Sequence, residues 1–214
     1  MTDAVAAEAE PLIVVVDDDT SVRESIGELL QSVGLDAIGF GSTRELLEAS
    51  LPQRPGCIVL DVRLPGGSGL DLQQHLTETG SCKPVIFLTG HGDITMSVQA
   101  MKAGALDFLT KPFRDQVLLD AVVAGIERDK EQLAAARLVD ASLERYARLT
   151  PREREVLDEI VRGRLNKQIA FDLGISEVTV KLHRSAVMKK MEARTVGELI
   201  RIWDRLPPGP RAKA

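Results

Sequence analysis

The stretch Val14-Val15-Val16-Asp17-Asp18-Asp19 decides the fold of this chain. Consecutive valines are typical of a strand that is buried on both faces, as in a parallel sheet covered by helices. Adjacent carboxylates follow directly, so like charges crowd together where the strand ends. This crowding at a sheet edge indicates a site for a cation.

Asp61, Thr89 and Lys111 each come at the end of a short apolar segment further along the chain. Ligands of open parallel sheets bind outside the carboxyl ends of the strands. We therefore expect these three side chains to meet Asp17 and Asp18 in one cleft.

Strand and helix patterns alternate over the first ~126 residues, which predicts an α/β domain with a doubly wound parallel sheet. We expect its five strands near Leu12–Val16, Ala37–Phe40, Ile58–Leu60, Val85–Leu88 and Asp107–Leu109.

The charge is distributed unevenly. Residues 1–144 contain 11 Lys and Arg against 23 Asp and Glu, whereas residues 145–214 contain 16 against 9. An acidic part joined to a basic part predicts two domains, the second with a polyanionic partner. We expect a flexible tail at 1–10, the α/β domain at 11–126, a helical linker at 127–148, an all-helical domain at 149–206 and a flexible tail at 207–214. No apolar run reaches the length of a membrane span, so we expect a cytoplasmic protein without a membrane partner.

The basic part contains the pattern of a helix-turn-helix. Thr150-Pro151-Arg152-Glu153 is a strong helix start, with a threonine cap and a proline at the first helical position. Asn166–Leu173 is a short helix closed by Gly174, and the next helix, capped by Ser176, runs to about Met191. A last helix covers Thr195–Asp204.

The second helix of this motif, Glu177–Met191, has an unusual outer face. Val180, Val187 and Met191 can face the core, which leaves Leu182 exposed among basic and hydroxyl side chains. An exposed leucine suits contact with thymine methyl groups, while lysine can reach guanine in the major groove. An ordinary charged face on a helix bundle is the alternative. The predicted DNA contacts are Thr179, Lys181, Leu182, Arg184, Ser185 and Lys189.

The acidic cleft suits Mg²⁺, which prefers oxygen ligands. Asp61 stands alone at its strand end, before a Pro/Gly-rich loop that exposes it, and is therefore the candidate nucleophile for an acyl phosphate. Lys111 and the Thr89 hydroxyl would bind the phosphoryl oxygens. Alternatively, Asp17–Asp19 form an ordinary polar turn in which Asp19 caps the following helix.

The first part of the chain resembles the receiver domain of two-component response regulators. The resemblance implies a flavodoxin-like fold and phosphorylation of Asp61 by a sensor histidine kinase. One departure is Gly66-Gly67, after the proline of the loop, where the family often has an acidic or polar residue. The matching segments are Val16-Asp17-Asp18, Leu60-Asp61-Val62-Arg63-Leu64-Pro65, Leu88-Thr89-Gly90-His91-Gly92 and Thr110-Lys111-Pro112-Phe113.

The same resemblance implies the roles of single residues. Asp18 and Asp61 would bind Mg²⁺ directly, Asp17 would assist through water, and the backbone carbonyl of Arg63 would be a further ligand. Thr89 and Phe108 would form a switch pair, and the Lys111–Pro112 peptide bond would be cis.

The second part, from Leu149 to about Trp203, resembles the LuxR-type domain of the NarL/FixJ family of response regulators. This resemblance implies a transcription regulator that is not an enzyme. Such a regulator forms a homodimer on phosphorylation and binds double-stranded promoter DNA, with RNA polymerase as a further candidate partner. One rival is a free-standing acyl-phosphate phosphatase, which needs a general acid at the position of Arg63. Another is a signalling adaptor whose basic domain binds protein or RNA.

Overall fold

The computed structural model describes residues 10–65, 67–90 and 94–211. They form two compact units that divide between Leu133 and Ala134. Each unit has its own hydrophobic core.

The first unit contains a five-stranded parallel sheet, as predicted. The strand order is β2-β1-β3-β6-β7, the order expected of a doubly wound flavodoxin-like fold. A small antiparallel pair, β4 (Arg63–Leu64) with β5 (Gly67–Ser68), lies in the loop after β3. The five parallel strands are β1 (Leu12–Val16), β2 (Asp36–Phe40), β3 (Ile58–Asp61), β6 (Val85–Thr89) and β7 (Asp107–Thr110).

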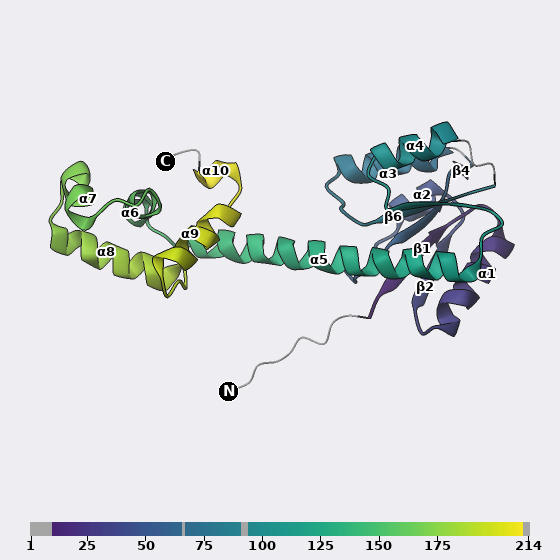
Figure 1. The fold of residues 1–214 in the computed structure, drawn as a ribbon, viewed down its shortest axis with the longest axis horizontal. Helices are drawn as coiled ribbons and strands as arrows, with labels where there is room; N and C mark the ends of the chain where they lie inside the picture. Colours follow the sequence, from purple (N-terminus) through teal and green to yellow (C-terminus); the bar gives the residue numbers. More distant parts are fainter. Residues whose placement is uncertain (1–9, 66, 91–93, 212–214) are drawn as a thin grey trace. The chain divides into compact units, whose positions relative to one another are not determined.

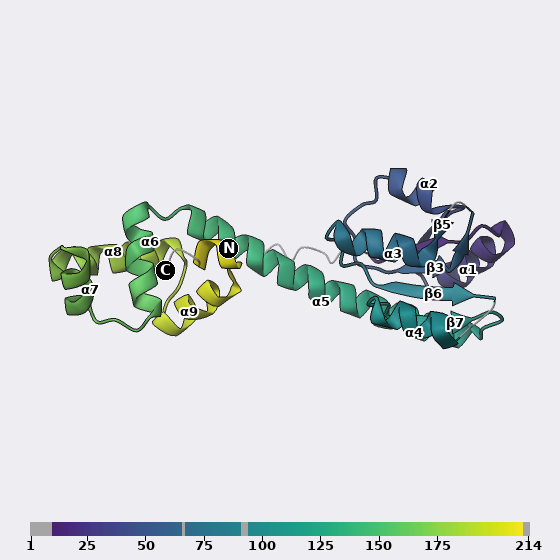
Figure 2. The same ribbon diagram turned by 90° about the horizontal axis from the view of Figure 1, so that it is seen from above.

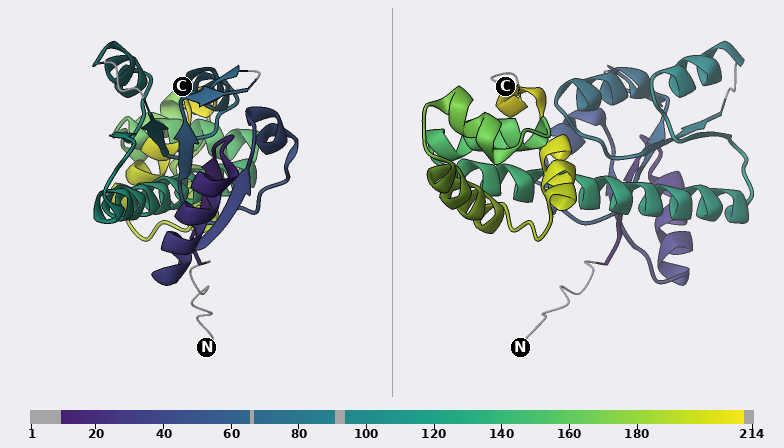
Figure 3. Two further views of the ribbon diagram at one scale, coloured as in Figure 1. Left: turned by 90° about the vertical axis from the view of Figure 1, so that its right-hand side faces the viewer. Right: turned by 60° about the vertical axis from the view of Figure 1, so that its left-hand side comes forward.

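Successive residues of β1 belong to opposite layers of the first unit. Ile13 and Val15 pack in the cluster that includes residues of α1 and α5, and Val14 and Val16 pack in the cluster that includes residues of α2, α3 and α4 (Figures 1 and 3). Since none of the four is more than 1% exposed, β1 is buried on both faces, as its valine run predicts. The helices are α1 (Thr20–Ser32), α2 (Thr43–Glu48), α3 (Gly69–Glu78), α4 (Ile94–Lys102) and α5 (Asp115–Ala147).

The helix α5 shows no break where we expected a linker to begin. It continues through residues 127–147, and Leu143 and Tyr146 near its end pack against the core of the second unit. The absence of Gly and Pro from residues 126–147 explains the continuity, since nothing in this segment disfavours helix. A continuous helix here does not test the expected bounds of the helical linker, which stay a prediction.

The second unit is built from helices, as predicted (Figure 2). The turn between α7 and α8 depends on Gly174, whose φ of 64° is in the left-handed region that favours glycine. The tail was expected to be flexible from residue 207, but Pro208–Arg211 form a short helix, α10, in which proline at the first position fits the helical φ. The other helices are α6 (Pro151–Val161), α7 (Asn166–Leu173), α8 (Glu177–Lys190) and α9 (Val196–Arg205).

A buried carboxylate connects α6 to the end of α8. Glu153 is 6% exposed, and its oxygens lie 2.6 and 2.9 Å from Nζ of Lys190. It also accepts the N–H of Thr150, which completes the predicted capping box. Burial acts to raise the pKa of Glu153, but the hydrogen bonds from Lys190 and Thr150 outweigh it and lower the pKa below 4.5.

Glu153→Gln should destabilise the second unit by about 2 kcal/mol at neutral pH, because it removes charge-assisted hydrogen bonds to a buried group. Denaturant unfolding followed by tryptophan fluorescence measures this unit selectively. Trp203 is the sole tryptophan of the chain, is 7% exposed and packs against Tyr146.

The stabilisation by Glu153 should depend on pH in a defined direction. Because the folded pKa of Glu153 lies below 4.5, its contribution is complete above pH 4.5 and is lost as pH falls through the folded pKa. The advantage of wild type over Glu153→Gln should shrink in that range. Glu155→Gln, in an exposed pair with Arg152, is the control and should change stability by less than about 0.5 kcal/mol. Equal effects of the two substitutions would contradict the assignment.

Candidate functional site

Three carboxylates meet at the carboxyl edge of the sheet. Asp17 and Asp18 follow β1 and Asp61 ends β3, its neighbour in the sheet. Ligand atoms of the three all lie within 4.8 Å of one another. Asp17 is fully buried, Asp61 is 8% exposed, and Asp18 is exposed.

Lys111, which directly follows β7, connects two of these carboxylates. Its Nζ lies 2.5 Å from Oδ2 of Asp17 and 2.6 Å from Oδ2 of Asp61. Burial acts to lower the pKa of Lys111, but the hydrogen bonds to both carboxylates outweigh it and raise the pKa. The lysine therefore remains a cation inside the cluster.

The single positive charge of Lys111 does not neutralise the three carboxylates of the cluster. The pKa of Asp17 is raised, first because of burial and further because of the neighbouring charge of Asp61, although Lys111 and the N–H of Asp19 act in the opposite direction. The ionised form of Asp17 is thus destabilised, and a second cation would relieve it. Carboxylates in close contact, one of them open to solvent, are the donor set that Mg²⁺ prefers, so the residues fit this ion.

The remaining contacts of Asp61 come from its own loop. Oδ1 accepts the N–H of Arg63 at 2.9 Å, while the Arg63 side chain is exposed. The role of the Arg63 carbonyl as a metal ligand stays a prediction. A hollow of about 490 Å³, lined by Asp18 and residues of β4 and β5, gives solvent access beside the cluster.

The predicted switch residues lie on the two strands beyond Asp61. Thr89, at the end of β6, is fully buried. Phe108, in β7, is half-buried and packs against Phe87 with ring centroids 6.4 Å apart. The Lys111–Pro112 bond is cis, as the resemblance implies. His91 and Gly92, in a segment that carries the resemblance, and Gly66, in the departure from it, lie outside the described residues.

The simpler interpretation of the aspartates as a helix-capping turn holds for Asp19. Its carboxylate accepts the N–H of Ser21 at 2.8 Å and caps α1. It does not explain Asp18, whose carboxylate bonds to no residue that the structure describes.

Four of the predicted DNA contacts form an exposed stripe on helix α8. Lys181, Ser185 and Lys189 are exposed, and Leu182 is 66% exposed. The expected core residues Val180, Val187 and Met191 are fully buried.

Two residues of the predicted DNA-binding set lie differently from the stripe. Thr179 is half-buried in the capping turn, with Oγ1 2.8 Å from Oγ of Ser176. Arg184 is half-buried and lines a hollow of about 520 Å³ with Arg164 and Lys167.

Sequence analysis missed two notable residues. Arg23 donates to the carbonyl of Asp17, and Phe171 in α7 is 87% exposed. No sequence signal distinguishes Arg23 from any other arginine on an amphipathic helix, whereas an aromatic residue beside Asp172 on a short polar helix is a weak sign of exposure.

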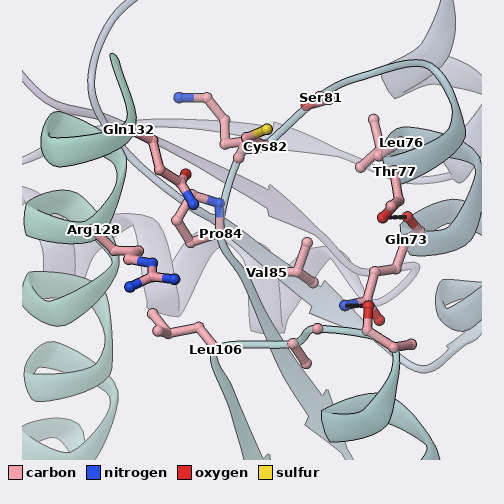
Figure 4. A pocket seen from close by; sticks show the side chains of 14 residues that line it. Gln73, Leu76, Thr77, Ser81, Cys82, Pro84, Val85, Leu106, Arg128 and Gln132 are labelled. Carbon is pink, nitrogen blue, oxygen red and sulfur yellow. Dashed lines mark hydrogen bonds between the residues drawn. The ribbon is translucent and has the colours of Figure 1, made fainter. Parts of the chain in front are cut away.

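Another hollow, of about 510 Å³, lies at the opposite edge of the sheet (Figure 4). Its floor includes Val85, the first residue of β6, and Leu106, which precedes β7. Arg128 and Gln132 approach it from α5. It has no carboxylate lining and lies at the amino ends of the strands, so we do not assign it to the acidic cluster.

Comparison with known proteins accounts for both units. Residues 13–123 match the response regulator receiver domain, and residues 147–203 match the LuxR family of bacterial regulatory proteins. Nodulation protein W of Bradyrhizobium diazoefficiens is 50% identical over 200 residues, which are 94% of this chain and 88% of that protein. The transcriptional regulatory protein FixJ of Azorhizobium caulinodans is 48% identical over 191 residues, 88% of this chain and 89% of that one.

Solved structures of response regulators are also similar to this chain over most of its length. The response regulator StyR is 45% identical, with a TM-score of 0.83 over 92% of this chain and 100% of that one. Full-length FixJ from B. japonicum is 36% identical, with a TM-score of 0.56 over 92% and 97% of the two chains. Within the described residues, none of the helices has both the length and the apolar character needed to cross a bilayer.

Asp18→Asn should keep the fold, because the side chain is exposed, yet it should raise the Mg²⁺ dissociation constant by at least about tenfold, the lower limit for losing even an outer-shell partner of a metal. Calorimetric titration with Mg²⁺ measures it. Asp19→Asn removes the same charge one residue away and keeps a good helix cap. An Asp18→Asn protein that binds Mg²⁺ no more weakly than Asp19→Asn would exclude Asp18 as a ligand.

Proposed function

Because the chain belongs to the two-component response regulators, with a receiver domain followed by a LuxR-type DNA-binding domain, we propose that phosphorylation of Asp61 by a sensor histidine kinase controls its binding to DNA. The observation that carries the proposal is the cluster of Asp17, Asp18 and Asp61 around Lys111. In this proposal the protein is a transcription regulator of the bacterial cytoplasm.

The phosphoryl group passes from a kinase histidine to Asp61. A carboxylate oxygen of Asp61 attacks the phosphorus, and the bond from phosphorus to the histidine nitrogen breaks, which leaves an acyl phosphate. Asp18, Asp61 and the Arg63 carbonyl would hold Mg²⁺, with Asp17 assisting through water, and the bound ion would supply positive charge for the phosphoryl oxygens. Lys111 already lies 2.6 Å from Asp61 and can hold one of these oxygens as a point charge.

Phosphorylation then biases an equilibrium between two states of the receiver domain. The Thr89 hydroxyl binds the phosphoryl group, and Phe108 repacks with it. The face formed by α4, β7 and α5 favours a homodimer in the phosphorylated state. Val98 and Met101 on α4 are 44% and 49% exposed, which supports an apolar contact there.

The stripe on α8 binds the major groove of promoter DNA. Lys181 and Leu182 reach base edges, and Ser185 lies between them and Lys189, which reaches phosphate. Arg184 and Thr179 are less exposed and act at the border of this contact. RNA polymerase is a further candidate partner, and the exposed Phe171 is a side chain that such a partner could bind.

The rival functions have less support. A phosphatase would need a general acid at Arg63, but a guanidinium does not release its proton in a protein. An adaptor that binds protein or RNA is less favoured because residues 147–203 match the LuxR family of bacterial regulatory proteins.

The wild-type protein, given a small acyl-phosphate donor and Mg²⁺, should incorporate phosphate and gain both dimer fraction and DNA affinity. Asp61→Asn should gain neither, because an amide is a poor nucleophile. Coupling energies of this kind predict an affinity gain of roughly 5- to 150-fold. Label incorporation, sedimentation and DNA titration measure the three quantities.

Asp36→Asn, at the start of β2 and 57% exposed at its side chain, is the control and should behave like wild type. Stoichiometric label in Asp61→Asn would refute the acceptor assignment. Equal dimer fraction and DNA affinity with and without the donor in wild type would refute phosphorylation control.

Lys181→Ala should cost roughly 1–3 kcal/mol at the preferred site and relax its specificity, whereas Lys189→Ala should weaken all sequences alike and lower the salt slope by about 1. DNA titrations at several salt concentrations, on specific and random duplexes, separate the two. Lys130→Ala, in the first unit, is the control. Equal losses on both duplexes for both variants would mean that α8 does not read bases, and no DNA binding in any condition would favour the adaptor.

A further inference from the structure

The three carboxylates of the acidic cluster are held in different ways. Asp17 bonds to Lys111 and to the N–H of Asp19, at 2.5 and 3.0 Å. Asp61 bonds to Lys111 and to the N–H of Arg63, at 2.6 and 2.9 Å. Asp18 has no such bond to any described residue, so the backbone that places its Cα is what the protein itself fixes at this ligand.

Arg23, on the first turns of α1, holds that backbone. Its Nη1 donates to the carbonyl oxygen of Asp17 at 2.6 Å, and its Nη2 donates to Oγ1 of Thr20 at 2.9 Å. The guanidinium thus bridges both ends of the turn that contains Asp18. The carbonyl of Asp17 shares a rigid peptide plane with the nitrogen and Cα of Asp18, so a bond to this oxygen orients Asp18.

The Arg23 side chain is itself confined by the end of β2. A Cβ at Gly39 would lie 3.5 Å from Cδ of Arg23, and one at Gly41 would lie 3.7 Å from Nη1. The arginine stem therefore runs along backbone that carries no side chain. With its head bonded at two points and its stem against β2, Arg23 has little freedom to move.

We infer that Arg23 is a positioning residue, which sets the direction of the Asp18 carboxylate for a divalent cation. This inference rests on the cation site of the proposed function and assigns a residue that lies outside the set of ligands. Arg23 donates its two bonds to the carbonyl of Asp17 and the hydroxyl of Thr20, not to a carboxylate of the cluster. It acts through the peptide bond between Asp17 and Asp18.

Charge and position predict opposite results when Arg23 is replaced. Removal of a nearby positive charge should by itself strengthen binding of a divalent cation, because it removes repulsion. Loss of the positioning bond should weaken binding instead. The sign of the change therefore separates the two effects.

Arg23→Gln should raise the Mg²⁺ dissociation constant about tenfold, at the lower end of the effect of outer-shell substitutions. Arg23→Lys keeps the charge but lacks the planar fork whose two nitrogens reach the Asp17 carbonyl and the Thr20 hydroxyl separately, so it should also weaken binding. Calorimetric titration of the full chain with Mg²⁺ measures both. With an acyl-phosphate donor, the Mg²⁺ concentration for half-maximal rate should rise, while the rate at saturating Mg²⁺ stays within about twofold of wild type, since the bonds of Lys111 to Asp61 remain.

Arg44→Gln is the matched control, because it removes the same charge from an exposed pair with Glu48 on α2. It should bind Mg²⁺ like wild type or slightly more tightly. If both Arg23 variants bind Mg²⁺ as tightly as Arg44→Gln while wild type is phosphorylated, the inference is overturned and the proposed function stands. If wild type neither binds Mg²⁺ nor accepts phosphate, both fail together.

Discussion

Repulsion among carboxylates that share one edge of the sheet is the constraint on which the first unit depends. A parallel sheet brings the ends of successive strands to the same edge. Here the carboxylates of Asp17, after β1, and Asp61, in β3, lie within 2.6 Å of Nζ of Lys111, which follows β7. The valine run of β1, buried on both faces, fixes where the strand ends and therefore where the aspartates lie at the sheet edge. The helices that cover the sheet thus serve the charge cluster by burying β1 on both faces.

A comparison of two buried carboxylates shows why one is structural and the other belongs to a binding site. Glu153 has its full complement of partners, and its pKa is lowered. Asp17 is buried more completely but shares one lysine with Asp61, and its pKa is raised. A carboxylate that the protein itself satisfies stabilises the fold, whereas one left partly unsatisfied has affinity for something from outside.

The features that sequence predicted are those with a strong local pattern. Doubly buried strands, helix caps such as Thr150 with Glu153, and polar residues at strand ends all depend on near neighbours in the chain. Two features depend instead on packing between distant segments and carried no such pattern. The bond from Arg23 requires α1 and the end of β2 to meet, and the half-burial of Arg184 requires the loop before α7.

The exposed stripe on α8 and the residues that hold this helix in place are separate sets. Val180, Val187 and the pair of Lys190 with Glu153 fix the helix, while Leu182 and Ser185 are exposed and lie outside the buried core. Substitutions on the stripe can therefore accumulate with little loss of stability. A duplicated copy of this gene could acquire a new set of target promoters one side chain at a time, while its helical scaffold stayed under constant selection.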